Sequence, residues 1–178
     1  MLGCLVIESK AQKIAVKSNL LYDATTTVNL GLEFGLARKW TLDIPVNYNP
    51  WKPDNGRRLR HWGVQPEVRY WFCESFNRTF VGVHGHYADF NVGGLPGIFS
   101  KNMQKNRYQG HLYGGGISVG HSWILKKRWS IEASVGLGYA RIEYEKYPCA
   151  ECGSKLKDTG RNYFGPTKAA LSIIYLIK

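Results

Sequence analysis

Apolar and polar residues alternate along most of the chain from Ile14 onward. A period of two residues is typical of β-strands that have one apolar and one polar face. The clearest stretch is 129–140, in which small or polar residues alternate with Trp129, Ile131, Ala133, Val135, Leu137 and Tyr139. The pattern predicts eight strands, at about residues 14–23, 26–37, 40–49, 59–73, 78–91, 110–124, 129–146 and 163–177.

The connections between these predicted strands alternate in length. Residues 37–39, 73–78 and 125–128 form short links. The long connections are polar and rich in Gly, Pro, Lys and Arg, and they cover 49–60, 92–109 and 147–162; only 23–25 is a short link on the long side. Short turns at one rim and long loops at the other are typical of outer-membrane barrels. The sequence therefore predicts an all-β, eight-stranded antiparallel up-and-down β-barrel of the transmembrane, outer-membrane type.

The alternation also fits a soluble barrel, so the direction of the apolar face has to be decided. A soluble lipocalin-like barrel would enclose an apolar ligand with that face, whereas a membrane barrel turns it toward lipid. Aromatic residues on this face lie ten residues apart in three strands, and ten residues of tilted strand rise roughly 25 Å, the height of a lipid-facing band. The predicted aromatic girdle comprises Trp40, Trp62, Phe72, Tyr113, Trp123, Trp129 and Tyr139.

The opposite face of the predicted strands is rich in glycine. Glycine weakens a strand, so a water-facing surface would more naturally carry Thr, Lys or Glu. A narrow eight-stranded interior, in contrast, needs small residues that leave room for a few large ones. The glycines concerned are Gly31, Gly35, Gly63, Gly82, Gly114, Gly116, Gly120, Gly136 and Gly138. Together with the aromatic spacing, they favour the membrane barrel over the soluble carrier, which stays as the alternative.

With that orientation, charged side chains of both signs face the interior of the barrel. Buried charges are costly unless they are paired, so we expect a salt-bridge network that plugs the barrel rather than an aqueous pore. The predicted interior network comprises Lys17, Glu33, Asp43, Glu67, Arg69, His84, His86, Glu132 and Lys168.

Candidate chemistry within this pattern is weak. His84 and His86 share one face of a strand, but zinc requires at least one more protein ligand, so neither a metal nor another cofactor is predicted. His121, Ser122 and Glu132 invite comparison with the catalytic set of lipid A deacylases, yet His121 has the opposite parity to the other two. A base must reach its nucleophile, so an enzyme is not expected.

Composition and charge are consistent with one folded domain. The chain has 178 residues and a formal net charge of +11. The basic residues gather in the connections, as at Arg57, Arg58 and Arg60, rather than along one stripe, so a nucleic-acid role is not predicted. Basic rims suit outer-membrane lipid and the phosphates of lipopolysaccharide.

The two ends of the chain and its cysteines add smaller predictions. Residues 1–11 resemble the remnant of a secretory signal peptide, with Ser9 and Ala11 before the expected cleavage point, and 12–178 is expected to form the single barrel domain. Outside the cytoplasm, Cys149 and Cys152 would form a local disulfide more naturally than a zinc site.

Several short runs resemble a family of small outer-membrane barrels of unknown function from Bacteroides-type bacteria, the domain of unknown function 3575. These runs are 17–24, 29–33, 40–43, 48–51, 67–71, 82–84 and 91–94. The resemblance implies a barrel in the bacterial outer membrane with a structural or anchoring role, linked with envelope or surface-fibre proteins through its long external loops. It brings no catalytic residues that can be carried over to this chain.

Overall fold

The computed structural model describes residues 13–50, 58–93, 107–147 and 157–177. In these residues the chain is almost entirely β-structure, with nine strands and one short helix, α1 (Leu20–Ala24). The strands are β1 (Ile14–Asn19), β2 (Val28–Ala37), β3 (Trp40–Asn49), β4 (Arg58–Val64), β5 (Glu67–Trp71), β6 (Arg78–Gly93), β7 (Arg107–Lys126), β8 (Trp129–Tyr147) and β9 (Lys157–Leu176).

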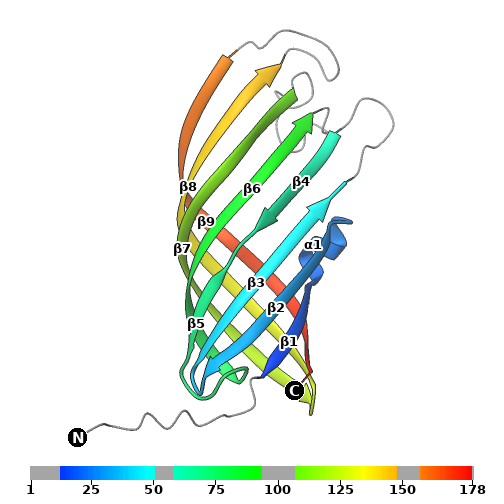
Figure 1. Cartoon of the computed structure of the whole chain (residues 1–178), viewed down its shortest axis with the longest axis vertical. Helices are drawn as coiled ribbons and strands as arrows, with labels where there is room; N and C mark the ends of the chain where they lie inside the picture. The colour runs from blue at the N-terminus through cyan, green and yellow to red at the C-terminus, as the bar shows by residue number, and fades with distance from the viewer. Residues whose placement is uncertain (1–12, 51–57, 94–106, 148–156, 178) are drawn as a thin grey trace, which may run out of the picture.

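All the strands belong to one antiparallel sheet whose hydrogen-bonded pairings form a closed ring. Strands that follow each other in the chain pair with each other, except that β4 and β5 share one place between β3 and β6. The ring closes because β1 pairs with both β2 and β9. Figure 1 shows the long strands β6 to β9 and the shorter strands β1 to β5 around this ring.

The predicted strand 59–73 is two strands, so the structure has nine rather than the eight that we predicted. The break falls at Gln65 and Pro66, between β4 and β5. Proline has no N–H to donate to a ladder, so it interrupts the strand on one side. The neighbouring strands bridge the break, since the Gln65 N–H donates to Pro45 and the Gly85 N–H donates to the Pro66 carbonyl.

The predicted strand 14–23 was too long, because β1 ends at Asn19 and α1 follows. The Asn19 side chain caps the helix by accepting a hydrogen bond from the Leu21 N–H, and Ser18 donates to Asp23 at 2.8 Å. Short polar side chains of this kind compete with the strand ladder for backbone groups. β7 and β9 begin earlier than predicted, at Arg107 and Lys157, so the connections before them are shorter than expected.

The two faces of the sheet differ sharply in exposure. Ile117 and Val83 on the outer face are 67% and 66% exposed, whereas Glu33 and Arg69 on the inner face are 0% and 1% exposed. The exposed outer set includes Val28, Leu30, Leu32, Val46, Val68, Val81, Val119, Val135, Leu137 and Leu171. The alternating pattern thus predicted which residues share a face, and the structure places the apolar face outside.

Inward-facing glycines leave space for large inward side chains. A Cβ atom at Gly82 would lie 2.6 Å from Glu67, and one at Gly136 would lie 3.0 Å from both His84 and Lys168. The predicted reason for glycine on this face, room for a few large residues, therefore fits the packing.

Two sequence predictions fall on residues that the structure does not describe. The predicted signal remnant at 1–11 and the candidate disulfide between Cys149 and Cys152 lie outside the described residues. Cys73 is exposed, and it forms no disulfide with another described residue. Among the described helical residues, none belongs to a helix long and apolar enough to cross a membrane.

Candidate functional site

Arg69 lies at the centre of a buried ionic cluster inside the closed sheet. It comes from β5, which points every second side chain inward. Its guanidinium group contacts four carboxylates. Glu67 of the same strand lies at 2.6 Å. The other three come from β3, β8 and β2: Asp43 at 2.5 Å, Glu132 at 3.1 Å and Glu33 at 3.2 Å. The planar fork of an arginine suits this number of carboxylate partners.

Two lysines complete the cluster from β1 and β9. Lys17 forms ion pairs with Glu33 and, at 3.0 Å, with Glu132. Lys168 pairs with Glu67 at 2.5 Å. We refer below to the ionic cluster as the set Lys17, Glu33, Asp43, Glu67, Arg69, Glu132 and Lys168, all at most 9% exposed. The structure thus brings these predicted residues together from six strands.

Carboxylates outnumber basic side chains by one in the ionic cluster, and one carboxylate oxygen lacks a partner. Glu33, Asp43, Glu67 and Glu132 face Lys17, Arg69 and Lys168. The Asp43 Oδ1 atom is buried and accepts no hydrogen bond within the described part of the chain, although its Oδ2 atom binds Arg69. A buried acceptor without a donor is unfavourable, so this oxygen marks a place where a donor group can bind.

Hydroxyl groups that the sequence analysis did not select also bind the ionic cluster. Thr41 donates a short hydrogen bond to Glu33, and Ser118 donates one to Glu67. Both have the inward parity of their strands, so parity could have found them. Thr167, whose hydroxyl binds His84, could not be found in this way. The register shift between β8 and β9 near Gly136 breaks the alternation there.

The two predicted histidines lie beside the ionic cluster rather than within it. His84 Nε2 and Thr167 Oγ1 are 3.0 Å apart, and the rings of His84 and His86 are 5.9 Å apart. The Nδ1 atoms of both rings are buried without a hydrogen-bond partner among the described residues. In the same part of the chain, no group of three or more His, Cys, Asp or Glu residues is placed to hold a metal ion.

Aromatic residues fill the interior on one side of the ionic cluster. The Trp71 and Phe80 ring centroids are 4.8 Å apart, and the Arg69 guanidinium lies 4.4 Å from the Phe80 centroid. Trp71 also donates a hydrogen bond to Thr41 at 2.9 Å, and Phe76 packs against it. The ion pairs and the aromatic rings together form a plug across the sheet interior at the level of β5.

The residues of the predicted aromatic girdle lie on the outer face and are exposed. Their exposed fractions lie between 42% for Tyr113 and 54% for Phe72. Near the short turns, Trp129 contacts Tyr175 with centroids 4.9 Å apart, and at the other end Trp62 contacts Tyr87 at 5.6 Å. The full set is Trp40, Trp62, Phe72, Tyr113, Trp123, Trp129 and Tyr139.

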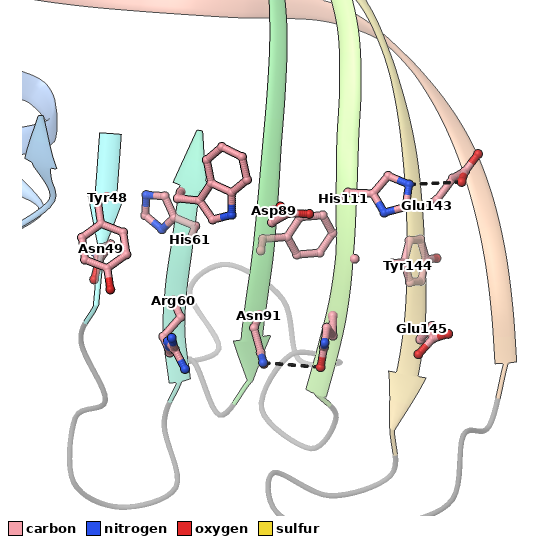
Figure 2. A pocket seen from close by; sticks show the side chains of 14 residues that line it. Tyr48, Asn49, Arg60, His61, Asp89, Asn91, His111, Glu143, Tyr144 and Glu145 are labelled. Atoms are coloured by element: carbon pink, nitrogen blue, oxygen red, sulfur yellow. Dashed lines mark hydrogen bonds and ion pairs between the residues drawn. The ribbon is translucent and has the colours of Figure 1, made fainter. Parts of the chain in front are cut away.

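A hollow of about 570 Å³ lies at the ends of β3, β4, β6, β7 and β8 that meet the long connections, and the girdle residue Trp62 is part of its lining. Figure 2 shows its polar lining, with His111 pairing with Glu143 at 3.3 Å. Arg141 donates to Glu143 at 2.9 Å, and this hydrogen bond lowers the pKa of the Glu143 carboxyl from its ordinary value. The hollow combines charges of both signs with aromatic rings, which resembles a polar contact surface more than a catalytic centre.

Comparison with known proteins gives a family but no function. A protein-family profile described as a protein of unknown function, DUF3575, matches residues 1–177. The chain belongs to this family. No curated protein matches the chain significantly. The family membership agrees with the resemblance found in the short sequence runs, and it assigns no activity, substrate or partner.

Proposed function

We propose that this DUF3575 protein is an outer-membrane β-barrel. The supporting observation is the continuous apolar outer face, bounded by two rows of exposed aromatic residues. Water-soluble monomers rarely expose apolar patches of more than a few hundred Å². Lipid-facing barrels have such a band, about 25 Å high, between aromatic girdles. The sheet closes into a ring because β1 pairs with both β2 and β9, as expected of strands that cross a bilayer.

The soluble lipocalin-like alternative fits these observations less well. A carrier of an apolar ligand needs an apolar interior. The interior here holds the ionic cluster, with Glu33, Glu67, Arg69 and Glu132 at most 1% exposed. A soluble protein with this arrangement would bury its charges and expose its leucines and valines.

For this barrel we propose a structural or anchoring role in the bacterial outer membrane. The ionic cluster and the aromatic rings of Trp71 and Phe80 block the interior at the level of β5, so the barrel is not expected to conduct solutes. The polar strand ends and long connections are suited to contact lipopolysaccharide and envelope or surface-fibre proteins. The charged residues of the interior are held by one another, which favours a structural rather than an enzymatic role.

The test is to express the full chain behind the signal peptide of an established outer-membrane protein in a Gram-negative host and to fractionate the envelope. We expect the protein in the outer-membrane fraction, resistant to extraction with alkaline carbonate. An unboiled sample should migrate differently from a boiled one on a detergent gel, because closed barrels resist unfolding by detergent. Recovery of the folded protein in the soluble fraction, with no shift on boiling, would refute the proposal.

A further inference from the structure

The ring of strands is closed by a full ladder at only one end of β9. The pairs between β1 and β9 stop at Asn19 and Ser172, although β9 begins at Lys157. Within the described residues, the part of β9 before Ser172 pairs in the ladder with β8 alone. Pro166 lies in this part of β9, and proline in a sheet is typical of edges and bulges. Within the described residues, β9 from Lys157 to Leu171 therefore has no strand partner on the side of β1.

Helix α1 covers this opening and is held there by side chains. The Asn19 side chain accepts hydrogen bonds from the Leu21 and Leu171 N–H groups, which ties the start of α1 to β9. On the other side, Asn29 of β2 donates to Asp23 at 2.7 Å. Figure 1 shows α1 at the end of β1, beside β2. A few exposed side-chain hydrogen bonds are much weaker than a strand ladder, so α1 can move without disrupting the ring.

Two hollows lie behind α1 inside the sheet, with volumes of about 330 and 370 Å³. They share five lining residues: Tyr22 of α1, Asn47, Gln65, Pro166 and Thr167. The first hollow reaches the ionic cluster at Lys17, Asp43, Arg69, Glu132 and Lys168. The second is lined by Leu112, Ala140 and Ile142, and also by His61 and His86. The combined space is charged at the ionic cluster, and its other part has an aliphatic patch beside the two histidines. Its size is typical of small-ligand sites.

The polar end of this space favours an uncharged head group that donates hydrogen bonds. The Asp43 Oδ1 atom is a buried acceptor without a partner, and Asp43 is only 3% exposed. The neighbouring Lys17, Arg69 and Lys168 already bind carboxylates, so a charged head group would find no free counter-charge. A hydroxyl group could donate to Asp43 and accept from Asn47 or Gln65, which line the same hollow.

We propose that the two hollows bind a single-chain amphiphile with an uncharged, hydroxyl-bearing head group, which enters from the lipid between β9 and the β1–β2 hairpin. The head group lies at Asp43, and the chain lies against Leu112, Ala140 and Ile142. Entry takes place when α1 moves away from β9. This inference rests on the proposed function, because lateral entry requires lipid around the outer face.

The test uses the full chain in phosphatidylcholine vesicles that contain a monoacylglycerol with a photoreactive diazirine in its chain. Insertion is checked first by the shift of the unboiled protein on a detergent gel. After illumination, mass spectrometry should find cross-links on the inward residues Leu112 and Ile142 as well as on outward residues such as Val83 and Ile117. Cross-links on outward residues alone, in a correctly inserted protein, would overturn the binding site and leave the membrane proposal intact.

Two comparisons test the position and the head group. The variant Ala140→Trp fills the second hollow without touching the ionic cluster, and it should reduce inward cross-links about tenfold. The matched variant Val83→Trp, on the outer face, should leave them unchanged. Probes with the same chain but a carboxylate or an ammonium head should label the interior several-fold less. Equal labelling by all three probes, or by both tryptophan variants, would overturn the proposal.

The entry route has its own test. The variant Asp23→Ala removes the hydrogen bonds from Ser18 and Asn29 that hold α1, and Asp23 lies outside the two hollows. We expect inward labelling to appear about threefold faster or more, with an unchanged final extent. The control Asp89→Ala removes an acid from the outer face of β6, where it binds Tyr87, and should not change the rate. An unchanged rate for Asp23→Ala would overturn entry at α1.

Discussion

Arg69 is the residue on which the ionic cluster depends, because it contacts each of the four buried carboxylates. Without its charge, those carboxylates, each at most 3% exposed, would repel one another. The variant Arg69→Leu should therefore lower the free energy of unfolding by about 3–5 kcal/mol, the cost of breaking a buried ion pair. The measurement is urea unfolding of the protein in vesicles, followed by tryptophan fluorescence.

Arg38→Leu is the matched control for this variant. Arg38 pairs with Glu74 at 3.2 Å, but both side chains are more than half exposed. Exposed pairs contribute about 0–1 kcal/mol, so this variant should unfold almost like the wild type. Equal losses for the two arginine variants would contradict a buried, interdependent cluster.

At the scale of elements, β7 and β8 approach each other closely at glycines. A Cβ atom at Gly138 would collide with the backbone of Gly115 and Gly116, which cannot move aside as a side chain can. We expect Gly138→Ala to destabilise the barrel by about 1–3 kcal/mol through overpacking and to reduce the folded yield. The folded fraction of refolded protein on an unboiled gel is the measurement.

Gly85→Ala provides the comparison at this scale. A Cβ atom at Gly85 would have only the Gly114 carbonyl oxygen nearby, at 3.8 Å, which is ordinary contact. The alanine is also the better strand residue, so the variant should fold at least as well as the wild type. A similar loss for both glycine variants would show that strand propensity, rather than close approach of β7 and β8, governs these positions.

The order and pairing of the strands followed from the sequence, but two local features did not. Alternation and connection length indicated antiparallel neighbours and the shared faces, because a strand turns every second side chain to the same side. The break at Gln65 and Pro66 keeps the alternation of a single strand on both sides, so alternation did not reveal it, although Pro66 marks the place. The helix α1 depends on Asn19, Asp23 and Asn29, whose partners are fixed only by the fold.

At the scale of the whole molecule, the proposed membrane position predicts a cost that depends on depth. Ile117 lies on the outer face of β7 between Tyr113 and Trp123 and is 67% exposed. The variant Ile117→Arg should destabilise the folded barrel by about 2–4 kcal/mol, because the charge would lie near the middle of the bilayer. Reversible urea titration of the protein in vesicles gives this difference.

Gln109→Arg serves as the control, since it introduces the same charge on the same strand beyond Tyr113. Near the membrane interface the cost should fall to about 0–1 kcal/mol. If the outer face met water instead of lipid, both arginines would be tolerated equally well. Equal stability of the two arginine variants would contradict the proposal that the outer face contacts lipid.

The sequence by itself determined which residues share a face, because the period of two is a local property of a strand. It also indicated the membrane orientation, through the spacing of aromatic residues and the glycines opposite them. Only the tertiary structure decided which buried side chains form ion pairs with each other. Arg69 meets Glu33, Asp43 and Glu132 from distant parts of the chain, and closure of the ring fixes those contacts. The opening at β9 and the hollows behind α1 also depend on where one ladder ends, which no local pattern encodes.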